Sequence, residues 1–355
     1  MREKTIKQVL RKKVDDWVKH LPEDLQKVVN ENVIITGGCI VSLMENNPPN
    51  DFDVYFKTKE SAKKVAKYYV DLFNKSHGPI DSKIGFDTRA IVLDGEDIEV
   101  SEGEIKILNP ELATLLKGSS FKNDDNTNGK FSGMSRMIAN TPKDRLKIYI
   151  QSKGLDAESP ESMRDNNYYM NTDEVVEGLD EISSDDIDKV DTGDKTPYRP
   201  VFLSSNAVSL SDKIQIIVRF YGDPSQVHDT FDFVHTKGYW DCATGDLVIP
   251  KEVYESVMNK VLIYTGSRYP VATLFRMRKF INRGWKINAG QIFKVAHQIS
   301  QLNLNNIDVL EDQLIGVDSL YFMHLIDSLR SKRLSDPNFN IDTVYVMSII
   351  DKMFG

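Results

Sequence analysis

The chain has little cysteine and little histidine for its 355 residues. Its two cysteines, Cys39 and Cys242, lie far apart and make no metal-binding spacing, and six scattered histidines add none. So little cysteine excludes a disulfide-stapled secreted scaffold and fits a reducing compartment. No hydrophobic run approaches the length of a membrane span, and the first residues lack the apolar core of a signal peptide. We therefore expect a cytoplasmic protein with no membrane partner.

Positive charge is also in deficit, since the net charge is −8, but the excess acid is concentrated in one segment. Residues 156–194 contain 14 Asp or Glu against Arg164 and Lys189, a net charge of −12. Because the whole chain carries −8, the remaining residues carry +4. A mildly basic body is compatible with nucleotide or RNA binding. The acidic segment either mimics a nucleic acid and covers the basic surface, or is a solvated disordered insertion.

The most informative stretch runs from Ile34 to Phe56. In it Gly37 and Gly38 are followed thirteen residues later by Asp51, with Asp53 two positions further on. Apolar residues before the glycines and between the acids predict a strand, a tight turn, a short helix and a second strand. On that second strand, alternation predicts one face with Asp51, Asp53 and Tyr55, and a core face with Phe52, Val54 and Phe56.

This pattern predicts chemistry on phosphates. Two carboxylates on one face form a site for Mg²⁺ or Mn²⁺, which completes its shell with water and substrate phosphates. Residues without Cβ let backbone N–H groups approach a triphosphate at the start of a helix. We therefore predict Asp51 and Asp53 as catalytic metal ligands and Gly37 and Gly38 as nucleotide-binding residues.

The Gly-Gly turn, helix and D-x-D strand resemble the signature of the DNA polymerase β nucleotidyltransferase superfamily, in particular the branch of tRNA CCA-adding enzymes and bacterial poly(A) polymerases. Residues 51–56, 202–222, 231–240 and 267–291 are similar to a nucleotidyltransferase-like family of bacteriophages that has no assigned substrate. The resemblance implies metal-dependent transfer of a nucleoside monophosphate from an NTP to a hydroxyl, with an RNA 3′ end as the expected acceptor. It also implies the host cytoplasm or the virion as the location.

Members of that superfamily usually add a third carboxylate from a later strand. A hairpin is predicted over residues 206–220. Its second strand has the expected inward positions Ile214, Ile216, Val218 and Phe220, and the expected outward positions Gln215, Ile217 and Arg219. Gln215 occupies the position that matches the third acid, and it supplies no charge for a second metal. Asp232, in a segment that resembles the family's arginine-and-aspartate motif, either completes the site as a catalytic acid or caps a helix or turn.

A basic stripe follows on a predicted helix that resembles the neck of the CCA-adding family. Arg276, Lys279 and Arg283 share one helix face. Such a stripe beside a triphosphate site binds phosphate or a nucleic-acid backbone, and elsewhere it is a solvated face. We predict Arg276 and Lys279 as nucleotide-binding residues. The family's base-reading Glu-Asp-x-x-Arg is not recognisable in residues 267–276, so base selection as in CCA addition is not expected.

The expected fold class is α+β. A mixed-sheet nucleotidyltransferase head spans residues 1–76 and 196–250, an insertion with the acidic segment spans 77–195, and a helical neck and C-terminal domain spans 251–355. Helices are expected over 5–20, 23–30 and 62–73. Two functions are considered. Asp51 and Asp53 together favour an active nucleotidyltransferase, whereas Gln215 favours a catalytically inactive nucleotidyltransferase fold kept as a binding or structural protein, including a virion protein.

Overall fold

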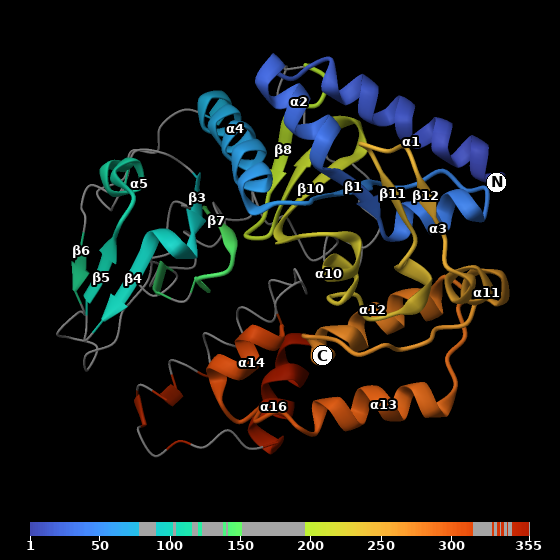
Figure 1. Cartoon of the computed structure of the whole chain (residues 1–355). Helices are drawn as coiled ribbons and strands as arrows, with labels where there is room; N and C mark the ends of the chain where they lie inside the picture. The colour runs from blue at the N-terminus through green and yellow to red at the C-terminus, as the bar shows by residue number, and fades with distance from the viewer. Residues whose placement is uncertain are drawn as a thin grey trace. The chain divides into compact units, whose positions relative to one another are not determined.

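The computed structural model describes residues 1–77, 90–101, 104–115, 120–122, 138–139, 141–150, 196–314, 329, 332–333, 335–336, 339 and 343–354. These residues belong to two compact units. Unit 1 contains the described residues up to His228 together with Gly238–Val248, and unit 2 contains Asp229–Lys237 and the described residues from Ile249 onward. The predicted α+β class, with a mixed sheet, is confirmed (Figure 1). None of the described helices is long and apolar enough to cross a membrane.

A seven-stranded sheet forms the centre of unit 1. Its order is β12-β11-β1-β2-β10-β9-β8. The strands are β1 (Val33–Thr36), β2 (Phe52–Phe56), β8 (Pro200–Leu203), β9 (Ala207–Leu210), β10 (Ile214–Tyr221), β11 (Tyr239–Asp241) and β12 (Leu247–Val248). Only β2 and β10 pair in parallel among these neighbours, and the other pairs are antiparallel. The sheet therefore joins strands from both ends of the sequence of unit 1, while the boundaries of head, insertion and tail stay a prediction.

Three long helices cover the apolar face of this sheet. They are α1 (Glu3–Val18), α2 (Glu23–Asn32) and α4 (Lys59–His77), close to the three predicted ranges (Figure 1). The buried positions of α1 recur at helical spacing and are Ile6, Leu10, Val14, Trp17 and Val18. Trp17 Nε1 donates a hydrogen bond of 2.6 Å to the Tyr69 hydroxyl, which satisfies both buried polar atoms and joins α1 to α4.

The burial of β2 agrees with its predicted alternation. Phe52, Val54 and Phe56 are buried and Asp53 is half-buried, although Tyr55 on the acid face is buried too. The prediction for β10 fails at its end, because Arg219 is buried and Phe220 is only half-buried. The pairing of β10 with β2 shifts register between Ile216 and Tyr221, and such an irregularity reverses which side chains face the core.

Two smaller sheets lie between β2 and β8 in sequence. One pairs β3 (Ala90–Asp94) with β7 (Leu146–Ile150), and the other has the order β4-β5-β6. The other described elements of this region are β4 (Ile98–Ser101), β5 (Glu104–Ile107), β6 (Ser120–Lys122), the 3-10 turn η1 (Gly95–Asp97) and α5 (Pro110–Leu115). Their shared core includes Ile91, Leu93, Ile98, Ile105, Ile107 and Leu112. The predicted acidic segment, residues 156–194, lies outside the described residues.

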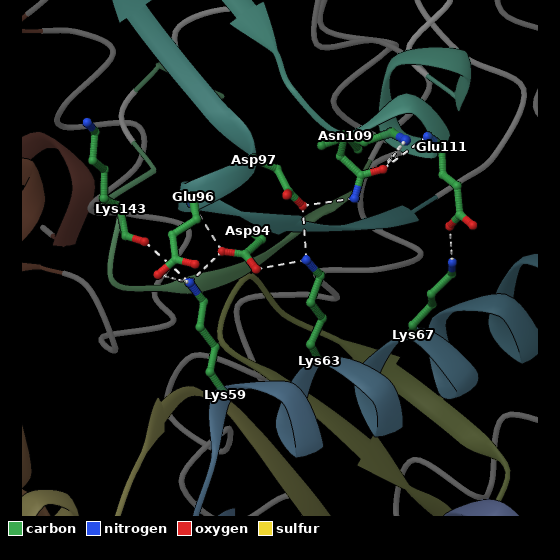
Figure 2. A network of polar contacts seen from close by, with 10 residues as sticks. Lys59, Lys63, Lys67, Asp94, Glu96, Asp97, Asn109, Glu111 and Lys143 are labelled. Atoms are coloured by element: carbon green, nitrogen blue, oxygen red, sulfur yellow. Dashed lines mark hydrogen bonds and ion pairs between the residues drawn. The ribbon is translucent and has the colours of Figure 1, made fainter.

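Lysines of α4 hold this region through ion pairs (Figure 2). Asp94 at the end of β3 is almost fully buried and lies 2.6 Å from Lys59 Nζ and 2.8 Å from Lys63 Nζ. Lys63 also contacts Asp97 at 2.9 Å. Burial alone would raise the pKa of Asp94, but the lysine hydrogen bonds outweigh it and lower that pKa. Asp94 is therefore a charged, fully paired anchor between α4 and β3.

Unit 2 is mainly helical. Its described elements are η4 (Val234–Thr236), α11 (Lys251–Asn259), α12 (Pro270–Asn282), α13 (Ala289–Ile299), α14 (Ile307–Gln313) and α16 (Thr343–Phe354). His235 lies within an aromatic cluster, with ring centroids 4.1 Å from Trp285 and 4.5 Å from Phe280. Neither nitrogen of its ring has a hydrogen-bond partner in the described part of the chain. Burial lowers the pKa of His235 to about 3, so the folded protein keeps this ring neutral.

We predict that Asp94→Ala destabilises unit 1 far more than Glu111→Ala. The first change removes a buried carboxylate and leaves two lysines without their closest partner, which costs about 2–3 kcal/mol. Glu111 pairs with Lys67 at 2.6 Å, but both side chains are more than half exposed, so solvent screens the pair and its loss should change the stability little. Urea unfolding followed by circular dichroism measures both. Equal losses for the two variants would contradict the role of Asp94 as an anchor.

We also predict that His235 makes stability depend on pH. The pKa of His235 in the folded protein lies below its value near 6.5 in the unfolded chain. Above pH 6.5 the ring is neutral in both states, so its protonation does not oppose folding. As pH falls, the unfolded chain takes up the proton first, and about 2 kcal/mol is lost between about pH 7.5 and about pH 5. His235→Leu should remove this part of the loss in urea titrations at the two pH values, whereas the exposed His20→Gln should keep it. Identical pH dependence in His235→Leu and wild type would refute the prediction.

Candidate functional site

The candidate site begins at the turn between β1 and α3 (Gly38–Met44). Gly37 has φ +90° and ψ −147°, a conformation that is open almost only to glycine. A Cβ built on Gly37 would lie 3.2 Å from Asp53 Oδ2. The structure therefore brings the predicted glycine turn directly against the predicted carboxylate. Gly38 starts α3, and a Cβ there would meet nothing within 4 Å.

Asp53 belongs to a row of polar side chains across three strands. It is paired in register with Gln215 of β10, and Gln215 is paired with Ser209 of β9. Paired residues project from the same face of a sheet, so the three side chains are neighbours. Gln215 Nε2 donates to Ser209 Oγ at 3.5 Å. Gln215 thus lies beside Asp53, where an acid was expected from the resemblance, and it brings an amide instead of a charge.

Cys39, the second residue of α3, lies in the field of both predicted acids. Burial raises the pKa of its thiol well above the ordinary value, and the negative charges of Asp53 and Asp51 raise it further. Its Sγ donates weakly to the Thr36 carbonyl oxygen at 3.7 Å. A thiol that resists ionisation is a poor nucleophile, so Cys39 is a packing residue of this site.

Thr36 and His228 extend the same polar face. Thr36 Oγ1 donates to the Gly238 carbonyl at 2.7 Å and lies 2.9 Å from His228 Nε2. Because the hydroxyl has one proton and gives it to Gly238, we infer that His228 Nε2 carries a proton and donates to Thr36. His228 ends the short helix α10 (Pro224–His228), and its ring lies 5.8 Å from that of Tyr239.

The sequence alone did not indicate Thr36, Ser209, His228 or Tyr239 as site residues. The only available signal was the position of Thr36 directly before Gly37. Tyr239 lies beside Thr36 because β11 pairs with β1, and His228 contacts Thr36 from the end of α10. Both residues are far from Thr36 in the sequence. Their contribution is therefore a property of the fold and not of a local motif.

Three other predicted residues lie in unit 2. Arg276 Nε is 2.5 Å from Asp232 Oδ2, and the Asp232 side chain is almost fully buried. The backbone carbonyl of Asp232 accepts from Thr265 N at 2.9 Å. Asp232 and Arg276 therefore neutralise each other within this unit. Lys279 lies one turn further along α12.

Among the described residues, no group of three or more His, Cys, Asp or Glu side chains is placed to hold a metal ion. The carboxylate pair Asp51 and Asp53 is flanked by Gln215, which is neutral. The residues present do not fit a two-metal site. Binding of a single Mg²⁺ or Mn²⁺ by Asp51 and Asp53 stays a prediction.

We predict that Gly37→Ala costs about 1–3 kcal/mol of folding free energy, because it combines a strained backbone with a close approach to Asp53. Gly38→Ala is the matched control. It adds a methyl group in open space at the start of a helix, so its effect should lie within about 0.5 kcal/mol. Thermal unfolding of both variants checks this. A Gly37→Ala protein as stable as Gly38→Ala would show that the turn does not depend on glycine.

Comparison with known proteins indicates a different family from the expected one. A curated protein named Gabija anti-defense 2, from Bacillus phage SPbetaL7, is 21% identical over 131 residues, covering 36% of this chain and 32% of that protein. The alignment thus spans about a third of that relative's length. No solved structure matches the chain.

A family model described as Gabija anti-defense 2 family protein matches residues 8–260. This finding contradicts the assignment to the nucleotidyltransferase superfamily and, with it, the predicted magnesium-dependent transfer of a nucleotide to RNA. Binding of an NTP, of RNA or of a single metal ion is not tested by it. The Gly-Gly and D-x-D pattern predicted local geometry, but geometry of this kind does not identify a reaction. Because the matched residues make up more than two thirds of its length, the chain belongs to the Gabija anti-defense 2 family.

Proposed function

We propose that this protein counteracts Gabija defence in the cytoplasm of a bacterium infected by a phage. The observation that carries the proposal is the family match over residues 8–260, which includes every strand of the seven-stranded sheet. The phage relative named Gabija anti-defense 2 supports the same function.

The polar face around Asp53 is the site that we assign to this activity. Polar side chains on a sheet reduce the apolar area that the strand buries, and proteins keep such departures from good packing mainly at functional sites. Asp53, Gln215 and Ser209 form a continuous row, and Thr36 with His228 lies on the adjoining strand and helix. The Asp53 carboxylate is half-buried against the Gly37 turn, so a group that binds there meets a negative charge that is partly shielded from water.

Plaque formation tests the function. Bacteria that carry Gabija would be infected with a phage that Gabija blocks, with and without expression of the full chain. We expect expression to raise the plaque count toward that on cells without Gabija. An unchanged count in cells that contain soluble, full-length protein would refute the proposed function.

The same assay tests the site. Asp53→Asn removes one charge and keeps the volume of the side chain, so we expect it to lose plaque restoration while circular dichroism and expression stay as in wild type. Asp246→Asn is the matched control, because the Asp246 side chain is 65% exposed and, within the part of the chain that the structure describes, its ion pair is a long 3.8 Å contact with Lys7. If Asp53→Asn restores plaques as well as Asp246→Asn, the function stands and the assignment of the site is wrong.

A further inference from the structure

A long stretch of unit 2 has no acidic residue. Between Glu255 and Asp308 the sequence contains no Asp or Glu and eight Lys or Arg, in a chain whose net charge is −8. These cations are Lys260, Arg268, Arg276, Arg278, Lys279, Arg283, Lys286 and Lys294. Nearly all of the stretch lies beyond residue 260, where the family match ends. Four of these cations, Arg276, Arg278, Lys279 and Lys294, lie in α12 and α13, and Arg276 is paired with Asp232.

The same two helices expose large apolar side chains. Leu274 and Ile281 of α12 are 40% and 44% exposed, and Ile292 and Phe293 of α13 are 44% and 70% exposed. Leu274, Arg278 and Ile281 follow one another at helical spacing, so they form one stripe. In α13 only Val295 is buried, although the helix is mostly apolar. Water-exposed apolar stripes of this kind are typical of interaction sites.

The exposed apolar residues belong to two helices that are in contact. α12 and α13 pack against each other in unit 2 (Figure 1). The α12–α13 surface consists of Leu274, Arg278 and Ile281 on the first helix and Ile292, Phe293 and Lys294 on the second. Arg278 and Lys294 are exposed beside the apolar residues. An apolar centre flanked by positive charge has the composition of a protein-binding surface, in which aromatic and arginine side chains contribute most of the affinity.

We propose that the α12–α13 surface binds an acidic protein surface with an apolar centre, carried by a protein of the Gabija defence. The identity of that partner rests on the proposed function. Charge complementarity selects the partner, because the surface lies in the acid-free stretch and attracts carboxylates at long range. Burial of Phe293 and the aliphatic side chains supplies the affinity.

A protein fits this surface better than a nucleic acid. Leu274, Ile281 and Ile292 have no ring on which a base can stack, and single-stranded nucleic acids gain much of their affinity from such stacking.

The test measures binding of the full chain to purified Gabija proteins by biolayer interferometry. Phe293→Glu should weaken binding about tenfold or more, and the pair Arg278→Glu with Lys294→Glu should weaken it by a similar factor and reduce its salt dependence. Tyr254→Glu on α11 is the matched control, because Tyr254 is 54% exposed but lies between Glu252 and Glu255, outside the acid-free stretch. It should bind as wild type does. Thermal unfolding checks that all variants remain folded.

Separate outcomes distinguish this inference from the proposed function. If the wild-type chain restores plaques but binds no Gabija protein, or if Phe293→Glu and the double variant bind as tightly as Tyr254→Glu, the α12–α13 surface is not the docking site. A failure of plaque restoration refutes the proposed function, whereas the binding measurement still decides on the surface. Loss of binding to a fluorescent single-stranded oligonucleotide in Phe293→Glu, with unchanged protein binding, would reassign the surface to nucleic acid. Self-association that Phe293→Glu abolishes in sedimentation would reassign it to a second copy.

Discussion

The parallel pairing of β2 with β10 is the constraint on which unit 1 depends. Phe52 faces Ile214 and Val54 faces Ile216, although a large part of the chain lies between the two strands. Closing so long a loop costs conformational entropy, which burial of these side chains must offset. The same pairing places Gln215 beside Asp53, so the core and the candidate site are formed by one ladder. Lys59 and Lys63 of α4 connect β3 to this sheet through their ion pairs with the buried Asp94.

Sequence patterns predicted well those helices and strands whose signals lie within a few neighbouring residues. The helical spacing of apolar residues in α1 and the alternation along β2 have their signals within a few residues, and the structure agrees with both. Arg219 and Phe220 were assigned to the wrong sides, because the register shift of β10 depends on its partner strand and leaves no mark in its own sequence. The partners of Asp94 and Thr36 are equally non-local.

The candidate site was predictable in part, because the glycine turn and the carboxylates also have local signals in the sequence. The Gly37 turn and Asp53 do lie together, as their spacing indicated, and Gln215 does occupy the neighbouring position. The predicted reaction was wrong because a glycine turn and two carboxylates are compatible with several functions on one architecture. The Asp232–Arg276 pair shows a second limit, since two residues predicted for the site neutralise each other within unit 2.

The proposed function and the proposed docking site together lead to one expectation, that the chain contacts a Gabija protein through the α12–α13 surface. Hydrogen exchange followed by mass spectrometry, on the full chain alone and mixed with purified Gabija proteins, tests this most directly. We expect slower exchange on mixing in residues 270–299, which form α12, α13 and the turn between them. Unchanged exchange throughout the chain, or slower exchange confined to segments outside α12 and α13, would contradict it.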